Sequence, residues 1–234
     1  MTGFIRYQFM SYIRSFKIIP PLTLFVIWVI IFYAYRGLPI ISSYAVTSTV
    51  IYLTITWIAM NIFSMEEETE KQMLFIQLGN KSRYLWGKWT ICFLTSLLLM
   101  LFAISYPLLM SNFKGTIQPI QVLLSVYCHT FLSVFGILVG SFSSITSFTM
   151  KKYTWLIAVL VIVLSISYEG IVEKLPLLKW VLFIFPPVVN VIKSMGDDET
   201  VHIGTDFWIM LIWTITYTII GFFIIGKLFL RKES

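Results

Sequence analysis

The residues that could do chemistry gather in one stretch, residues 64–88. It holds four of the eleven acidic residues and four of the seventeen basic residues of a chain that is otherwise mostly apolar. These are Glu66, Glu67, Glu68, Glu70, Lys71, Lys81, Arg83 and Lys88. Such a stretch could belong to a hydrolytic site, form a charged helix at a membrane surface, or be a plain solvated loop.

Local signals favour a short helix in this stretch. Ser64 and Glu67 have the spacing of a capping box, in which both side chains bind free backbone N–H groups. Acidic residues suit the first turns of a helix, and Glu67 precedes Lys71 by four residues, the better order for an ion pair. Apolar side chains follow at Met73, Leu74 and Ile76. Gly79-Asn80 is a stop signal that would end the helix. Together these signals predict a short amphipathic helix at the water interface.

A second carboxylate pair, Glu169 and Glu173, is spaced to lie on one helix face. Carboxylates within a membrane are costly and often functional. This pair could bind a cation, pair with Lys174 or Lys179, contact a substrate, or lie in water at a helix end.

Polar side chains also recur along two apolar segments. One series is Thr47, Thr54 and Asn61, and the other is Thr214, Tyr217, Thr218 and Gly221. Polar stripes on membrane helices face protein or water rather than lipid. They could line a substrate passage, and helix–helix packing is the other explanation.

The composition is that of a membrane protein. Charged residues make up 12% of the 234 residues and apolar ones 58%, with a mean hydropathy of +0.87, whereas soluble domains average about 25% charged residues. We attribute the net charge of +6 to Lys and Arg kept on the cytoplasmic side and expect no nucleic-acid partner. Cys92 and Cys128 lie in apolar runs, where we expect buried thiols. No cleavage site follows the basic start, so we expect no signal peptide.

We predict an all-α membrane protein with one membrane domain, residues 1–234. Six spans are expected, near residues 21–35, 43–63, 84–110, 119–144, 153–170 and 206–226. An interfacial helix (1–19) precedes them, the charged helix (64–80) follows the second span, and an outer re-entrant region (171–205) precedes the last. With six spans and a cytoplasmic amino terminus, twelve of the seventeen Lys and Arg residues lie inside, whereas a seventh span across 175–191 would place the basic tail outside.

The sequence offers no catalytic, cofactor or metal site. Gly87-Lys88 is followed by Trp89, so the chain lacks a phosphate-binding loop. Glu66-Glu67 followed by Lys71 is close to the paired-glutamate signature of the CAAX-protease-like family, but that signature has Arg at the position of Lys71 and needs further histidines. Only His129 and His202 are present, far apart in the chain. We therefore expect no enzyme.

The order of these segments resembles a type-2 ABC transporter permease over nearly the whole chain. The likeness is carried by the amino-terminal helix, the charged helix, the segment Asn80–Lys88 (NKSRYLWGK) and the Phe185-Pro186-Pro187 end of the re-entrant segment. In size, the chain is most similar to the small permeases of bacterial peptide exporters and peptide-immunity transporters. The four glutamates of the charged helix depart from the family pattern.

The resemblance implies a bacterial plasma-membrane exporter with both termini in the cytoplasm. Two identical permease chains in the lipid bilayer would join two ABC ATPase subunits, which hydrolyse the ATP, and no cofactor is expected. The ATPase would contact Glu66, Glu67, Glu70, Lys71, Met73 and Leu74. Amphipathic or antimicrobial peptides would be exported along a path that could include Thr47, Thr54, Asn61, Glu169, Glu173, Thr214 and Tyr217. A secondary transporter and a non-transporting immunity protein are the alternatives.

Overall fold

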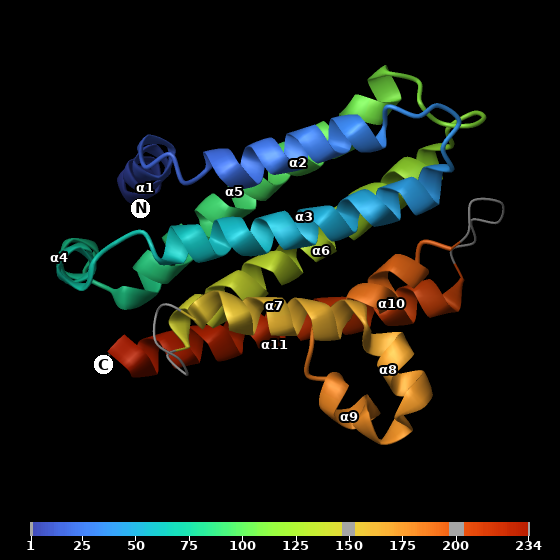
Figure 1. Ribbon diagram of the computed structural model, residues 1–234. Helices are drawn as coiled ribbons and strands as arrows, with labels where there is room; N and C mark the ends of the chain where they lie inside the picture. Colours follow the sequence, from blue (N-terminus) through green and yellow to red (C-terminus); the bar gives the residue numbers. More distant parts are fainter. Residues whose placement is uncertain (1, 147–152, 197–203, 234) are drawn as a thin grey trace.

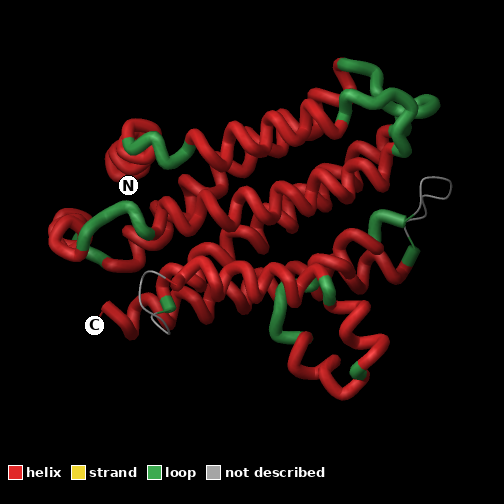
Figure 2. Tube along the Cα trace, viewed as in Figure 1, coloured by secondary structure: helices red, strands yellow, loops and turns green. Residues whose placement is uncertain are grey.

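The computed structural model describes residues 2–146, 153–196 and 204–233, and within them the chain is helical with no β-strand (Figures 1 and 2). The longer helices are α1 (Thr2–Arg14), α2 (Ile19–Phe32), α3 (Ile40–Phe63), α4 (Glu68–Leu78), α5 (Lys81–Leu109), α6 (Pro119–Ile145), α7 (Thr154–Ile166) and α11 (Thr205–Glu233). Shorter pieces are α8 (Tyr168–Lys174), the 3₁₀ turn η2 (Pro176–Leu178), α9 (Lys179–Leu182) and α10 (Val188–Lys193).

Four of these helices, α3, α5, α6 and α11, are long and apolar enough to cross a membrane. Helices α1 and α2 meet at 75° and α7 and α8 at 65°, and the number of candidate spans rises to six if each bent pair is one span. The prediction of an all-α, multi-pass membrane protein is confirmed. The expected fifth span is shorter than predicted, because α7 ends at Ile166 and the charged segment after it turns away from the helix axis.

The core of the bundle is the contact between α3 and α6. Gly136 and Gly140 form the contact surface on α6, as their spacing predicts. A Cβ atom added at Gly136 would lie 2.9 Å from the Tyr52 carbonyl oxygen. One added at Gly140 would lie 2.6 Å from both the Ala59 Cβ and the Thr56 carbonyl oxygen. The two backbones therefore touch, and no larger residue fits between them.

This close contact gives a stability prediction. Gly140→Ala should force α3 and α6 apart and destabilise the fold by about 1–3 kcal/mol, as overpacking usually does. Gly170→Ala is the control, because nothing lies within 4 Å of the position of its added Cβ. Cys92 and Cys128 are buried free thiols, so a thiol-reactive dye reports unfolding in detergent. Equal midpoints for the two variants would contradict the packing account.

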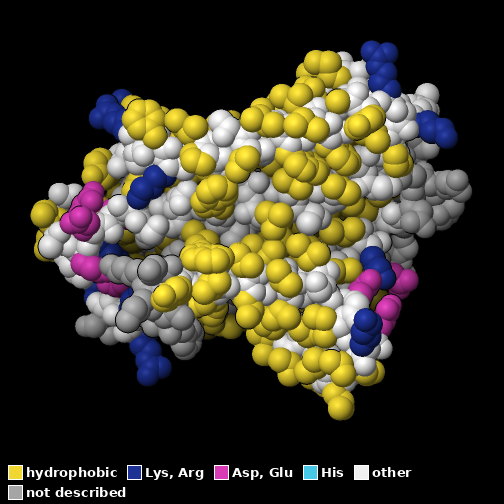
Figure 3. Space-filling model, viewed as in Figure 1, with side chains coloured by type: hydrophobic (Ala, Val, Ile, Leu, Met, Phe, Trp, Pro, Cys, Tyr) yellow, Lys and Arg dark blue, Asp and Glu magenta, His cyan; other side chains and the backbone are white. Residues whose placement is uncertain are grey.

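One end of the bundle collects α1, α4 and the carboxyl end of α11 (Figure 1). The connections 33–39 and 110–118 lie at the opposite end. On the face shown in Figure 3, apolar side chains lie along the length of the bundle between its two ends. Most of the charged side chains on this face lie toward the two ends. The first helix, the charged helix and the basic tail therefore lie at the same end of the bundle. Lys151, Lys152 and His202 lie outside the described residues.

The predicted capping box is wrong. The Ser64 hydroxyl donates to the Met60 carbonyl oxygen at 2.7 Å, so Ser64 ends α3 instead of starting α4. Helix α4 begins at Glu68, and the side chain of its N-cap residue, Glu67, makes no capping bond. A serine near the end of a helix can bond back to its own last turn, and that alternative prevails here. The predicted stop is confirmed, because Gly79 has a left-handed φ of 66°.

Residues 175–191 are broken into short pieces, as their prolines predict. η2 and α9 come first, a turn holds Pro186 and Pro187, and α10 follows. Figure 1 shows α8 and α9 projecting from the side of the bundle. The Tyr217 hydroxyl on α11 donates to the Ile184 carbonyl oxygen at 2.8 Å and ties this segment to the last helix.

Candidate functional site

Helix α4 has one face against the protein and one face open. Leu74 and Phe75 are buried with 7% and 6% of their surfaces exposed. Met73 and Ile76 point the other way, with 61% and 81% exposed. The open face continues through Thr69 and Gln72, which are also exposed. We call Thr69, Gln72, Met73 and Ile76 the open face of α4. It exposes two large apolar side chains beside two polar ones.

The inner face of α4 is joined to two other helices. Phe75 packs edge-on against Tyr84 of α5 and Phe229 of α11, with ring centroids 5.0 and 6.1 Å apart. Lys71 forms an ion pair with Glu233 at the end of α11, instead of the predicted pair with Glu67. Helix α4 is therefore attached to the last helix as well as to its chain neighbours.

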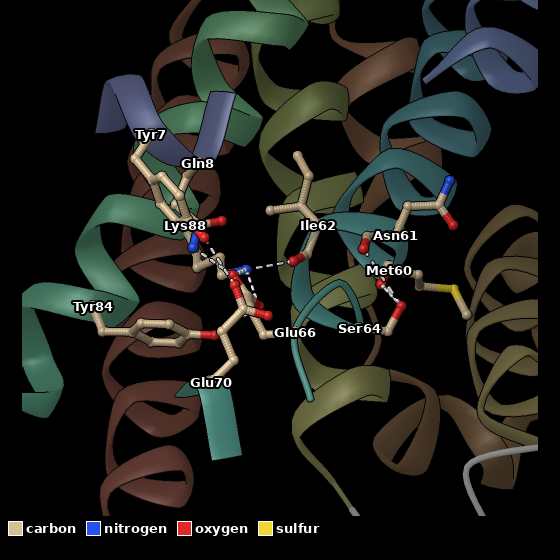
Figure 4. Close-up of polar contacts among 10 residues, drawn as sticks. All are labelled: Tyr7, Gln8, Met60, Asn61, Ile62, Ser64, Glu66, Glu70, Tyr84 and Lys88. Atoms are coloured by element: carbon tan, nitrogen blue, oxygen red, sulfur yellow. Dashed lines mark hydrogen bonds and ion pairs between the residues drawn. The ribbon is translucent and has the colours of Figure 1, made fainter. Parts of the chain in front are cut away.

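A buried ion pair lies where α3 leads into α4. The Lys88 side chain has no exposed surface, the Glu66 side chain has 2%, and the Lys88 ammonium contacts both carboxylate oxygens of Glu66 (Figure 4). Lys88 also donates to the Ile62 carbonyl oxygen at 2.6 Å, and the Tyr84 hydroxyl donates to Glu66 at 3.0 Å. Charges removed from water are tolerated only when they are paired and hydrogen-bonded, and this pair meets both conditions.

Helix α1 shares this polar cluster. The Gln8 amide donates to Glu66, and the Tyr7 hydroxyl donates to the Glu70 carboxylate at 2.9 Å. The ring of Phe4 lies over Gly87 so closely that an added Cβ would be 2.3 Å from it. The segment before α4, the first turn of α4, the start of α5 and the middle of α1 are thus held as one unit.

A cavity of about 630 Å³ adjoins the start of α4. Its apolar wall comes from α3 and α7 and includes Leu53, Trp57, Val159 and Ile162. Its polar wall includes Asn61, Ser64, Glu68, Lys71 and Lys232. A cavity with an apolar wall and a polar wall suits an amphipathic ligand.

The proposed ATPase contacts do not all face outward. Glu67 is exposed, Glu70 and Lys71 are half-buried, and Met73 is on the open face. Glu66 and Leu74 are buried and therefore cannot contact a partner in this conformation.

The polar series of α3 points mainly toward protein. The hydroxyl of Thr47 lies 3.2 Å from the His129 Nε2 atom of α6, and both side chains are buried. The Thr54 hydroxyl donates to the Val50 carbonyl oxygen, and the Asn61 amide donates to the Lys17 carbonyl oxygen. Of the three residues, Asn61 alone lines the 630 Å³ cavity.

The other predicted path residues lie elsewhere. Glu169 forms a 2.6 Å ion pair with Lys193 instead of Lys174 or Lys179, and Glu173 is exposed on the same short helix α8. Thr214 is buried and donates to the Met210 carbonyl oxygen of its own helix, and Tyr217 holds Ile184. The structure therefore does not bring these residues and the α3 series together into one passage.

Sequence reasoning missed the structural role of Lys88 and Glu233. Glu66 and Lys88 are separated by 22 positions, and Lys71 and Glu233 by 162. One signal was present for Lys88, because a lysine eight positions into a long apolar helix needs a counter-charge. Glu233 lies in a short charged tail and carries no comparable signal.

Residues 2–146, 153–196 and 204–233 contain no group of three or more His, Cys, Asp or Glu side chains that could hold a metal ion. No protein family, curated protein or solved structure matches the chain.

Proposed function

We propose that the chain is the transmembrane subunit of an ATP-driven ABC exporter. One observation carries the proposal: α4 exposes Met73 and Ile76 on its open face, and its inner face is tied to α1, α5 and α11. A surface helix built in this way can take up a push from a partner and pass it to several spans at once. In this proposal α4 lies in the cytosol, the chain crosses the membrane six times, and 171–205 re-enters from outside.

The motor in this proposal is a separate protein. The sequence contains no phosphate-binding loop, so ATP hydrolysis would be done by an ABC ATPase bound to the open face of α4. Two such ATPases would serve two copies of this chain. ATP-driven closure of the ATPase pair would then move α4 and the helices attached to it.

The cargo in this proposal is an amphipathic compound, with an antimicrobial peptide as the first candidate. The support comes from the 630 Å³ cavity, which combines the indole of Trp57 and aliphatic side chains with the polar groups of Asn61 and Lys232. The cavity also borders Glu68 and Lys71 of α4. A shift of α4 would therefore change the shape of the cavity.

Transport into inside-out vesicles tests the proposal. Vesicles holding the chain and its co-expressed ATPase should take up a fluorescent amphipathic peptide when ATP is supplied, and a proton ionophore should leave the uptake unchanged. Vesicles with the chain alone should show no ATP-dependent uptake. Uptake driven by a proton gradient without ATP would instead support a secondary transporter and would contradict the proposal.

A further inference from the structure

A second cavity lies on a different side of the bundle, between α1 and α5, and measures about 500 Å³. Its two walls are helical stripes that face each other. Thr2, Ile5, Arg6 and Phe9 line it from α1. Leu94, Leu97 and Leu98 line it from α5. We call this cavity the α1–α5 groove.

The charge in the groove is at one wall only. Arg6 is its only charged lining residue; the side chain is exposed, and no described residue forms a hydrogen bond or ion pair with it. Leu94 and Leu98 on the opposite wall are exposed, and they lie in the apolar run of α5. One guanidinium group beside an aliphatic wall matches a molecule with an anionic head and a hydrocarbon tail.

The position of the groove fits a lipid of the bilayer. Helix α1 crosses α5 at Gly87, where Phe4 rests on the glycine. Leu94 and Leu98 lie seven and eleven positions further along, which at 1.5 Å per residue is roughly 10–16 Å along the helix axis. A tail that starts near Arg6 would therefore run along α5 toward the middle of the apolar span.

We propose that the α1–α5 groove binds one anionic phospholipid, with the lipid phosphate against the Arg6 guanidinium and an acyl chain along Leu94, Leu97 and Leu98. The bilayer surrounding the chain supplies this ligand. Such a lipid would fill the gap between α1 and α5 and hold α1 in place. The proposal does not depend on the transport function.

Native mass spectrometry of the detergent-solubilised full chain tests this proposal. Phosphatidylglycerol and phosphatidylcholine of equal chain length are titrated in parallel. The chain should retain one phosphatidylglycerol more tightly than phosphatidylcholine, and Arg6→Gln should weaken that retention about tenfold, the size expected for one lost charge-assisted contact. Arg14→Gln is the matched control, because Arg14 is an exposed cation of the same helix outside the groove.

Two further arms address the tail and the headgroup. Leu97→Trp should fill the apolar part and reduce retention of the lipid while Arg6 is intact. Inorganic phosphate at millimolar concentration should not displace the lipid, because it lacks the chain that occupies the groove. The proposal is overturned if Arg6→Gln retains phosphatidylglycerol as tightly as the parent chain, or if Arg14→Gln weakens that retention as much as Arg6→Gln does. It is also overturned if phosphatidylcholine binds as tightly as phosphatidylglycerol, if Leu97→Trp leaves lipid retention unchanged, or if phosphate displaces the lipid.

Discussion

Lys88→Met is expected to destabilise the chain by about 3–5 kcal/mol, the usual cost of leaving a buried charge without its partner. The Glu66 carboxylate would remain out of water with only the Tyr84 hydroxyl and the Gln8 amide as donors. The Ile62 carbonyl oxygen would also lose its Lys88 partner. Since this cluster joins α1, α4 and α5, the loss should affect the whole end of the bundle.

A double-mutant cycle separates the pair from its surroundings. Glu66→Gln, Lys88→Met and the double variant are compared by the temperature at which a thiol dye labels Cys92 and Cys128. The double variant should be clearly more stable than the sum of the single losses predicts, because it buries no unpaired charge. Lys193→Met is the control, because Lys193 and its ion-pair partner Glu169 are both exposed. We expect this variant to change the free energy of unfolding by about 0–1 kcal/mol. Additive losses at Glu66 and Lys88 would contradict the paired-charge account.

The second large effect is expected at the open face of α4. Met73→Glu with Ile76→Glu should strongly weaken binding of the proposed ATPase, because apolar side chains that become buried at an interface carry most of its binding energy. Each anchor contributes about 2 kcal/mol or more, so the pair should weaken binding roughly a thousandfold. Both side chains are exposed in the isolated chain, so its own stability should not change.

Co-purification of the ATPase and the unfolding temperature of the chain are measured for the same preparations. Met73→Leu with Ile76→Val keeps the face apolar and should retain the ATPase. If the glutamate variant retained the ATPase and ATP-driven uptake, the open face would not be the docking surface. If it lost stability instead, the face would belong to the fold.

Much of the fold could be predicted because its signals are local. Long apolar runs mark α3, α5, α6 and α11, Gly79 marks the end of α4, and the spacing of Gly136 and Gly140 marks a close helix contact. The start of α4 was placed too early because Ser64 can cap a new helix or bond back into the preceding one. Only the turn geometry decides between these two options.

The site was harder to predict because its contacts connect distant parts of the chain. The sequence pattern grouped Glu66 with the other glutamates of the charged helix. In the structure its side chain points inward and contacts Lys88 and Gln8. The apolar residues of α4 divide between two faces, and the division depends on where Phe229 of α11 lies. The cavity beside α4 is likewise formed by α3, α7 and α11 together, and no single segment encodes it.

In the proposed function, an ATPase moves the chain through the open face of α4. This role of the open face is tested most directly by placing a photo-crosslinking amino acid at Ile76 and, as a matched control, at the neighbouring buried Phe75. In living cells the chain labelled at position 76 should form an adduct with an ATPase subunit, and the chain labelled at position 75 should form none. Equal adducts at both positions, or no ATPase adduct at position 76, would contradict the account.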